Sequence, residues 1–227
     1  MDESRATDDL DVPALLDRLG RLSSTSLVDA SPALRVLPPE IRPLVPGRRF
    51  VGRVVTARAN RDLMSVIHGL RESGAGDVLV VDVGGDERAV AGELFGTEAQ
   101  RRGLAGLVLH GRCRDRATLA RLDLPVWSTG VAPNAYAARA LPETGVALSL
   151  NGVAVHPGEL LLGDDDGLIT GSAAEFAQAV AGAEAIEARE KALQARLLAG
   201  ASLFDAMNYD EHLAALRDGR PGGLAFG

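Results

Sequence analysis

Cysteine is nearly absent from this sequence, because Cys113 is the only one in a chain of 227 residues. A single thiol excludes an intrachain disulfide and a zinc site built from several thiolates. Aromatic residues are also scarce, at 4%, so alanine, valine and leucine must fill most of the core that 46% hydrophobic residues can form. No apolar run approaches the roughly 20 residues that a membrane-spanning helix needs.

Positive charge is also limited: 24 lysines and arginines face 31 aspartates and glutamates, which gives a formal net charge of −7. This balance argues against a dedicated nucleic-acid-binding protein, whose surface carries a basic face. The first residues are acidic and lack the basic and apolar regions of a signal peptide. We therefore expect a cytoplasmic protein with no nucleic-acid partner and no membrane attachment.

Lysine is the rarest basic residue, since Lys191 is the only one. It lies in the charged stretch 185–191, which is typical of a solvated helix face. An enzyme that cleaves carbon–carbon bonds through a Schiff base needs a desolvated lysine amine. If this protein breaks carbon–carbon bonds, a metal ion is therefore the expected electrophile.

The order of predicted elements favours a layered α/β fold. Helices are predicted at 12–22, after the Ser/Thr run 23–26, and at 62–73, 94–102, 134–141, 173–198 and 209–216. Strands are predicted at 50–57, 77–83, 105–110, 125–128, 146–150, 153–156, 159–162 and 168–170, with 88–91 either a short strand or the start of a helix. We expect N-terminal helices and a proline-rich connection over 1–45, an α/β core over 46–172, and a C-terminal helical extension and tail over 173–227.

Two junctions between predicted elements carry residues suited to chemistry. At the first, Gly92-Glu93-Leu94-Phe95 opens a helix, whose unpaired N–H groups can hold a carboxylate or phosphate. The second follows strand 105–110 and ends in Arg114-Asp115. An arginine grips a carboxylate with two hydrogen bonds, and an aspartate offers oxygen to a hard cation. Each junction alone is weak evidence, since Arg-Asp after a strand is more often a salt-bridged loop.

Taken together, the order and spacing of these motifs resemble the RraA-like family over roughly residues 20–175. The matching segments are Gly76–Asp82, Gly84-Gly85, Gly92-Glu93-Leu94, Gly103–Val108, Gly111 and Arg114-Asp115. The family includes 4-hydroxy-4-methyl-2-oxoglutarate aldolases, which also act as oxaloacetate decarboxylases. It also includes RraA proper, a protein inhibitor of an RNA-degrading endonuclease.

The aldolase branch is marked by an acidic residue, twenty intervening residues and then Arg-Asp, whereas RraA proper lacks this Asp. Glu93 and Arg114-Asp115 have that spacing. The resemblance therefore implies a divalent-metal-dependent class II aldolase or decarboxylase that acts on a small 2-oxo di-acid.

The resemblance also implies roles for these residues. Asp115 would be the direct protein ligand of Mg²⁺ or Mn²⁺, and water would fill most other positions. Arg114 and the N–H groups of residues 92–95 would hold the carboxylates, and Arg114 and the metal would stabilise a pyruvate enolate. Glu93 would position or deprotonate a metal-bound water that serves as acid or base.

For the whole molecule, the resemblance implies a swivelling β/β/α-type sandwich with N-terminal helices and a C-terminal helical extension. It further implies a homotrimer or homohexamer with the site near a subunit interface. A carboxylate from the neighbouring tail would complete the site, and the candidates are Asp205, Asp210 and Glu211.

Other interpretations remain open at this stage. One is a non-catalytic regulator that binds a ribonuclease or another protein, and another is a related lyase of a biosynthetic pathway. Arg112 either favours an acidic substrate or pairs with a surface carboxylate, and His110 is adjacent to the site with or without a role. Cys113 is expected to be structural, and Asp164-Asp165-Asp166-Gly167 is expected to be a turn between short strands.

Overall fold

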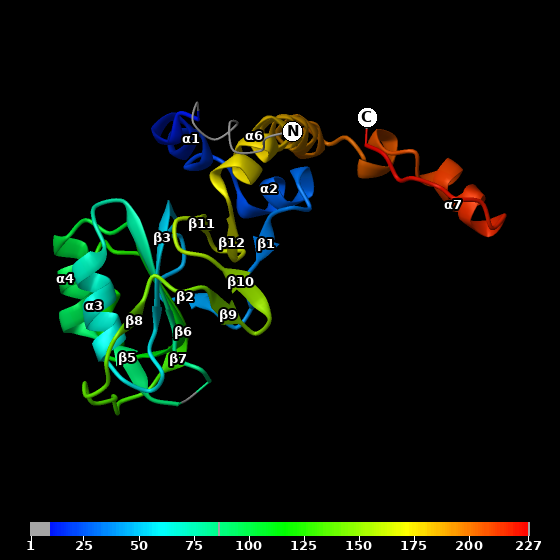
Figure 1. Cartoon of the computed structure of the whole chain (residues 1–227). Coiled ribbons are helices and arrows are strands. Elements are labelled where there is room, and N and C mark those ends of the chain that lie inside the picture. Colours follow the sequence, from blue (N-terminus) through cyan, green and yellow to red (C-terminus); the bar gives the residue numbers. More distant parts are fainter. Residues whose placement is uncertain (1–9, 86, 227) are drawn as a thin grey trace, which may run out of the picture. The chain divides into compact units, whose positions relative to one another are not determined.

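The computed structural model describes residues 10–85 and 87–226, which form two compact units. The first unit extends to Ala183 and contains the β-sheet (Figure 1). The second runs from Glu184 to the C-terminal end. The boundary falls inside the helix α6, Ala173–Leu198, whose bounds match the prediction.

A ten-stranded mixed sheet forms the centre of the first unit, in the order β1-β12-β11-β3-β4-β6-β7-β2 with β5 and β8 beside this path. The strands are β1 Arg35–Val36, β2 Arg42–Pro43, β3 Phe50–Arg58, β4 Asp77–Asp82, β5 Ala89–Ala91, β6 Gly106–Cys113, β7 Val126–Val131, β8 Glu143–Thr144, β11 Leu160–Gly163 and β12 Leu168–Gly171. Strands β3, β4, β6 and β7 are mutually parallel, and β5 is parallel to β6. This architecture confirms the predicted layered α/β fold.

Both faces of the sheet are covered, as the continuous apolar run of β4 predicts. Helices α3, Met64–Glu72, and α4, Glu93–Arg101, lie side by side over one face (Figure 1). The hairpin of β9, Leu148–Leu150, and β10, Val153–Val155, contributes to a second core on the other face. Trp127 is fully buried there, and its ring meets Phe50 edge-on at 4.9 Å.

The N-terminal helices α1, Val12–Leu19, and α2, Ser24–Ala30, form a third core with the first half of α6 and strands β11 and β12. Ser23 caps α2 by accepting the N–H of Ser26 at 3.1 Å, as the Ser/Thr run predicts. Both the N–H and the hydroxyl of Ser24 donate to the Asp164 carboxylate at 2.7 Å. Asp164 begins the turn from β11 to β12, which confirms the turn prediction for 164–167.

The predicted helix at 134–141 is wrong, because the backbone groups of this segment bond to distant residues instead of to one another. Ala89 donates to the Asn134 carbonyl at 2.8 Å, and Leu63 donates to the Ala137 carbonyl at 2.9 Å. The predicted strand 105–110 is too short, since β6 continues through Gly111 to Cys113 beside β5 and β7.

The other predicted element boundaries differ less from those in the structure. The helix predicted at 12–22 ends at Leu19, and the connection predicted as irregular over 31–49 contains the two-residue strands β1 and β2. The segment 88–91 is a strand, β5, rather than the start of a helix. A further helix, α5, Arg116–Leu119, follows β6 directly.

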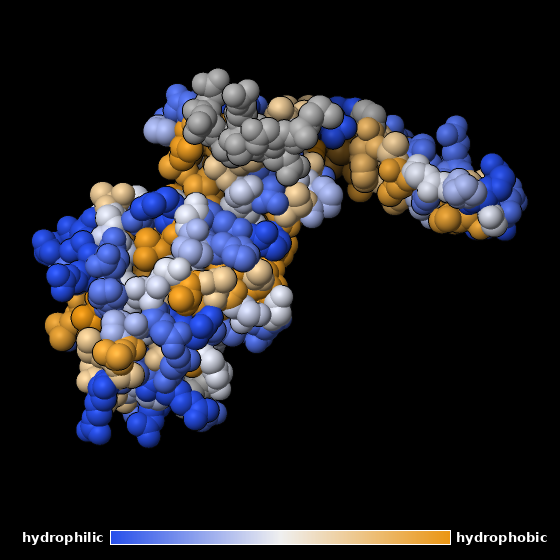
Figure 2. Space-filling model, viewed as in Figure 1, coloured by the Kyte–Doolittle hydropathy of each residue, from blue (hydrophilic) through white to orange (hydrophobic). Residues whose placement is uncertain are grey.

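The second unit contains the rest of α6, the 3₁₀ helix η2, Leu203–Ala206, and α7, Tyr209–Arg217. The tail turns back on α7, where Asn208 accepts the N–H of Ala225 at 2.8 Å and donates to the Gly223 carbonyl at 3.1 Å. Apolar side chains show at the surface of this unit among charged ones (Figure 2), and Phe204 is 64% exposed. No helix within the described ranges is long and apolar enough to cross a membrane.

Candidate active site

Parallel pairing of β5 with β6 creates the site. Ala91 lies opposite Cys113, so the residues that follow the two strands emerge side by side. The N–H of Arg114 donates to the Ala91 carbonyl at 2.9 Å and extends this pairing by one residue. The start of α4 therefore lies against Arg114 and Asp115, although 20 residues separate the two segments in sequence.

A pocket of about 260 Å³ opens at this junction. Its lining consists of Leu63, Val90, Ala91, Gly92, Glu93, Leu94, Phe95, Arg114, Asp115 and Ala135. All the predicted site residues, namely Gly92, Glu93, Leu94, Phe95, Arg114 and Asp115, are among them. The structure thus brings these residues together, while the roles assigned to them stay predictions.

Asp115 adopts the left-handed conformation, with φ 56° and ψ 37°. Aspartate is one of the few residues other than glycine that visits this region, because its short polar side chain bonds locally. Its carbonyl accepts the N–H groups of Thr118 and Leu119 at 2.9 and 3.0 Å. Its carboxylate Oδ2 accepts the N–H of Glu93 at 3.2 Å and lies 3.4 Å from Nε of Arg114. The carboxylate is therefore held between the start of α4 and the guanidinium.

Gly92 has no side chain, and this leaves the space in which the Asp115 carboxylate approaches the start of α4. A Cβ at this position would lie 2.4 Å from Oδ2 of Asp115 and 2.9 Å from Cγ of Arg114. Its φ of −153° is ordinary extended backbone, so the requirement for glycine is steric rather than conformational. Any side chain here would displace the Asp115 carboxylate.

The start of α4 presents backbone donors to the pocket. The first turn of a helix has N–H groups without helical partners, and its partial positive charge favours an anion. Within the described part of the chain, the N–H of Glu93 bonds to Asp115 and no acceptor bonds the N–H groups of Leu94 and Phe95. These two donors, with Arg114, can hold a carboxylate.

The residues present fit a hard divalent cation bound mainly through water. Asp115 is partly exposed and lines the pocket, and in the described chain its Oδ1 accepts no hydrogen bond. No group of three or more His, Cys, Asp or Glu side chains suited to a metal occurs among the described residues. An ion at Asp115 would therefore complete its shell with water and substrate, which is typical of magnesium.

Three residues beside the motif lie outside the pocket lining. His110 Nδ1 lies 3.0 Å from Oδ1 of Asp82, with both side chains largely buried. Burial raises the pKa of Asp82, but hydrogen bonds from His110 and the Gly84 N–H outweigh it and hold the pKa below its ordinary value. Arg112 lies 3.8 Å from Glu87, which supports the surface-pair interpretation. Burial raises the pKa of the Cys113 thiol, so this side chain is a poor nucleophile.

The pocket also has an apolar wall, which the sequence motifs do not predict. Ala135 lines it from within the wrongly predicted helix region, Leu63 from the residue before α3, and Val90 from β5. Ala135 is placed by a bridge to Ala89, which no local pattern shows.

A buried carboxylate, Asp62, fixes this wall. It accepts the N–H of Met64 at 2.8 Å, and those of Arg139 and Ala140 at 2.7 and 3.1 Å. Burial raises its pKa, but these backbone hydrogen bonds outweigh burial and hold the pKa below the ordinary value. Asp62 thus ties the start of α3, next to Leu63, to the segment that follows Ala135.

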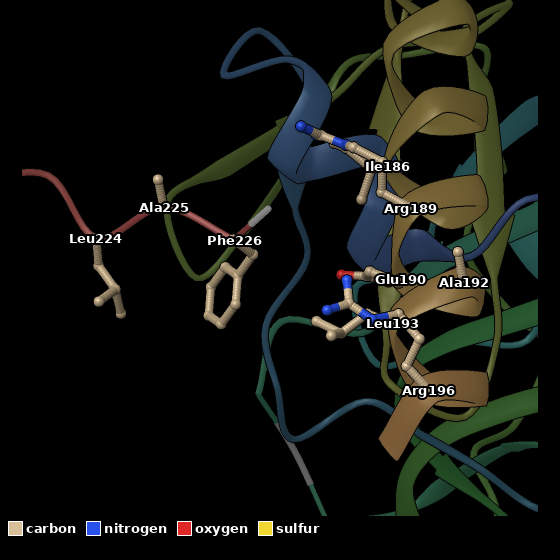
Figure 3. Close-up of a pocket in the computed structure, with 9 residues that line it drawn as sticks. All are labelled: Ile186, Arg189, Glu190, Ala192, Leu193, Arg196, Leu224, Ala225 and Phe226. Carbon is tan, nitrogen blue, oxygen red and sulfur yellow. The ribbon is translucent and has the colours of Figure 1, made fainter. Parts of the chain in front are cut away.

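A larger cavity, of about 660 Å³, lies in the second unit between α6 and residues 224–226 (Figure 3). Its charged lining residues are Arg189, Glu190 and Arg196, and none of the predicted site residues contributes to it. The smaller pocket at Asp115 is therefore the better candidate for chemistry, because it combines a carboxylate, a guanidinium and a helix N-terminus.

Comparison with known proteins identifies the family of the chain. A family model described as RraA-like, Aldolase/RraA, matches residues 24–170 and thus spans the whole pocket. The chain is 37% identical over 147 residues to a 4-hydroxy-4-methyl-2-oxoglutarate aldolase of Thermus thermophilus, and the match covers 64% of this chain and 90% of that protein.

Two solved structures are similar to the chain. The RNA-processing inhibitor RraA from Thermus thermophilus has 38% identity and a TM-score of 0.61, covering 65% of this chain and 91% of that one. Streptomyces coelicolor RraAS2, described as an unusual member of the RNase ES inhibitor RraA family, has 28% identity and a TM-score of 0.71, covering 81% and 98%.

Proposed function

Because the chain belongs to the RraA-like family, we propose that it is a divalent-metal-dependent lyase that cleaves a carbon–carbon bond of a small 2-oxo acid. The reference substrates are the di-acids 4-hydroxy-4-methyl-2-oxoglutarate, for aldol cleavage, and oxaloacetate, for decarboxylation. One observation carries the proposal. The Asp115 carboxylate is held beside Arg114 and the start of α4, with Glu93 lining the same pocket.

Arg114 and the N–H groups of Leu94 and Phe95 bind the carboxylate of the 2-oxo acid head. The guanidinium is planar and forms paired hydrogen bonds with a carboxylate, so it orients the head as well as attracting it. Asp115 would hold Mg²⁺ or Mn²⁺, which when bound supplies Lewis-acid stabilisation of the charge that develops on the 2-oxo oxygen. Arg114 adds to that stabilisation because it lies beside the same oxygen-rich end of the substrate.

Glu93 is the pocket group suited to move a proton. In aldol cleavage the 4-hydroxyl loses its proton, the C3–C4 bond breaks, and the electron pair passes to C3 and the 2-oxo oxygen. A proton then returns to C3 and yields pyruvate. Glu93 accepts the first proton, directly or through a water, and returns one to C3 by the same route.

A second candidate function is favoured by the similarity to RraA of Thermus thermophilus, described as an RNA-processing inhibitor, and to RraAS2, described as an unusual member of the RNase ES inhibitor RraA family. In that case the chain would bind a ribonuclease and need no turnover. One fold can serve both functions, so the fold alone does not distinguish an enzyme from a regulator, and the chemistry of the site must be tested.

The test measures pyruvate released from each reference substrate with Mg²⁺, with Mn²⁺, and with a chelator. An enzyme-free blank that contains the same metal corrects for spontaneous loss of CO₂ from oxaloacetate. We expect turnover that the chelator abolishes and added metal restores. Turnover that is unchanged by the chelator would refute metal dependence. Absence of turnover on both substrates, together with inhibition of a ribonuclease, would favour the regulator.

A further inference from the structure

In the proposed function, the metal ion and the substrate head engage every charged side chain of the described pocket lining. The divalent cation offsets the carboxylates of Glu93 and Asp115, and Arg114 offsets the carboxylate of the 2-oxo acid head. The other lining side chains in the described chain are apolar, among them those of Val90 and Ala135. The second carboxylate of a di-acid therefore needs a cation from just outside this lining, because an unpaired charge that loses water is costly.

Arg88 lies at the edge of the apolar wall. It directly precedes β5, whose Val90 lines the pocket. Ala89 is bridged to Ala135, another lining residue, and Tyr136 donates its N–H to the Ala89 carbonyl at 3.4 Å. The guanidinium of Arg88 lies over the Tyr136 ring, 5.8 Å from its centroid. This contact holds the charge of Arg88 beside the residue that follows Ala135 in the wall.

The guanidinium of Arg88 is available to a ligand. Arg88 is exposed, and its contact with the ring is a cation–π contact rather than a hydrogen bond. Within the described ranges its side chain forms no ion pair and donates no hydrogen bond. Its donors can therefore grip a carboxylate with paired hydrogen bonds.

We infer that Arg88 determines specificity for di-acids by binding the distal carboxylate of the substrate. The inference rests on the proposed function, which places the head at Arg114 and the metal ion, and it deepens that function by assigning a residue to the tail. Arg88 precedes Val90 by two residues, which is about 7 Å along an extended chain. The long arginine side chain can cover this separation toward a substrate tail that lies on the wall.

Two other arginines lie near the same wall and are the rival candidates. Arg61 precedes Asp62 in the segment before α3, and Arg139 donates its backbone N–H to the Asp62 carboxylate at 2.7 Å. Arg88 is favoured because its ring contact places the guanidinium itself next to the pocket lining.

Direct binding tests the inference without turnover. Calorimetric titration in Mg²⁺ compares 2-oxoglutarate with 2-oxopentanoate, which share the 2-oxo acid head and carry a carboxylate and a methyl group, respectively, at the tail. We expect Arg88→Gln to weaken binding of 2-oxoglutarate by at least about tenfold, because charge-assisted hydrogen bonds are lost, and to leave 2-oxopentanoate binding unchanged. Arg88→Lys should restore part of the di-acid affinity, because it keeps the charge without the paired donors.

The matched control is Arg71→Gln, an exposed arginine in the last turn of α3, which should bind both acids as the unaltered protein does. Arg61→Gln and Arg139→Gln test the two rivals. An equal loss for both acids in Arg88→Gln would indicate a structural role and overturn the inference. So would unchanged di-acid binding in Arg88→Gln, a selective loss in either rival variant alone, or no binding of 2-oxoglutarate to the unaltered protein.

Turnover separates the inference from the proposed function. Cleavage of 4-hydroxy-4-methyl-2-oxoglutarate at C3–C4 gives two pyruvates, and we expect its kcat/KM to fall at least about tenfold in Arg88→Gln and to stay unchanged in Arg71→Gln. Cleavage with an unchanged kcat/KM in Arg88→Gln would refute the inference and leave the proposed function intact. No cleavage by the unaltered protein, together with a selective loss of 2-oxoglutarate binding in Arg88→Gln, would refute the proposed function and support the assignment of Arg88.

Discussion

Two residues from different segments determine where the Asp115 carboxylate lies. The left-handed backbone of Asp115 directs its carboxylate back toward α4, where the N–H of Glu93 receives it. Gly92 leaves the space that the carboxylate occupies. Neither feature follows from the motif spacing, which predicts proximity of the two segments but not the orientation of the side chain.

Replacing Gly92 with alanine should therefore impair catalysis far more than folding. The added Cβ would overlap Oδ2 of Asp115, so the carboxylate must move while the backbone of α4 keeps its ordinary conformation. Displacements of about 1 Å in a catalytic group reduce rates by about a hundredfold, and we expect kcat/KM to fall by that order. Circular dichroism should report an intact fold.

The control for this substitution is Gly167→Ala, because a Cβ there meets no atom within 4 Å. Gly167 lies in the turn before β12, and its alanine variant should retain the activity of the unaltered protein. Equal activity of the two variants would show that the position of the Asp115 carboxylate is unimportant.

Elements with a strong local pattern were predictable from the sequence. Helix α6 has its predicted bounds, and β3 and β4 each differ from the prediction by one residue, since their apolar runs and flanking glycines are unambiguous. The segment 134–141 was not predictable, because Ala89, Leu63 and Asp62 satisfy its backbone from elsewhere in the chain. The apolar wall of the pocket was missed for the same reason.

Asp62 joins two elements, so its loss should destabilise the fold. The ionised carboxylate accepts three backbone N–H groups, and Asp62→Ala leaves them without this acceptor. We expect the free energy of unfolding at pH 7 to fall by about 1–2 kcal/mol, measured by urea denaturation. The control is Asp166→Ala, an exposed turn residue whose carboxylate accepts no hydrogen bond in the described chain.

The loss of stability caused by Asp62→Ala should depend on pH in a predictable way. Because the pKa of Asp62 is lower in the folded than in the unfolded protein, its contribution to stability is fully present above the unfolded value. That contribution should be lost as the pH falls below about 3.9 and through the lower folded pKa. A stability difference between wild type and Asp62→Ala that stays constant across this range would contradict the role assigned to the carboxylate.

At the scale of the whole molecule, the family match and the pocket lie in the first unit, and the second unit contributes a separate surface with exposed apolar residues. Assembly as a homotrimer or homohexamer stays a prediction, which light scattering would decide. Participation of Asp205, Asp210 or Glu211 in a neighbouring site also stays a prediction. Truncation after residue 200 tests it, and full activity of the truncated chain would exclude it.

The central claim is that the Asp115 pocket is the active site of a metal-dependent lyase. Its most direct test compares Asp115→Ala with Asp166→Ala in Mn²⁺ titrations and in pyruvate release from the better of the cleavable 2-oxo acids. We predict that Asp115→Ala loses Mn²⁺ affinity and about a hundredfold to a thousandfold in kcat/KM, while Asp166→Ala retains both. If Asp115→Ala keeps the Mn²⁺ affinity and turnover of the unaltered protein, the active site lies elsewhere.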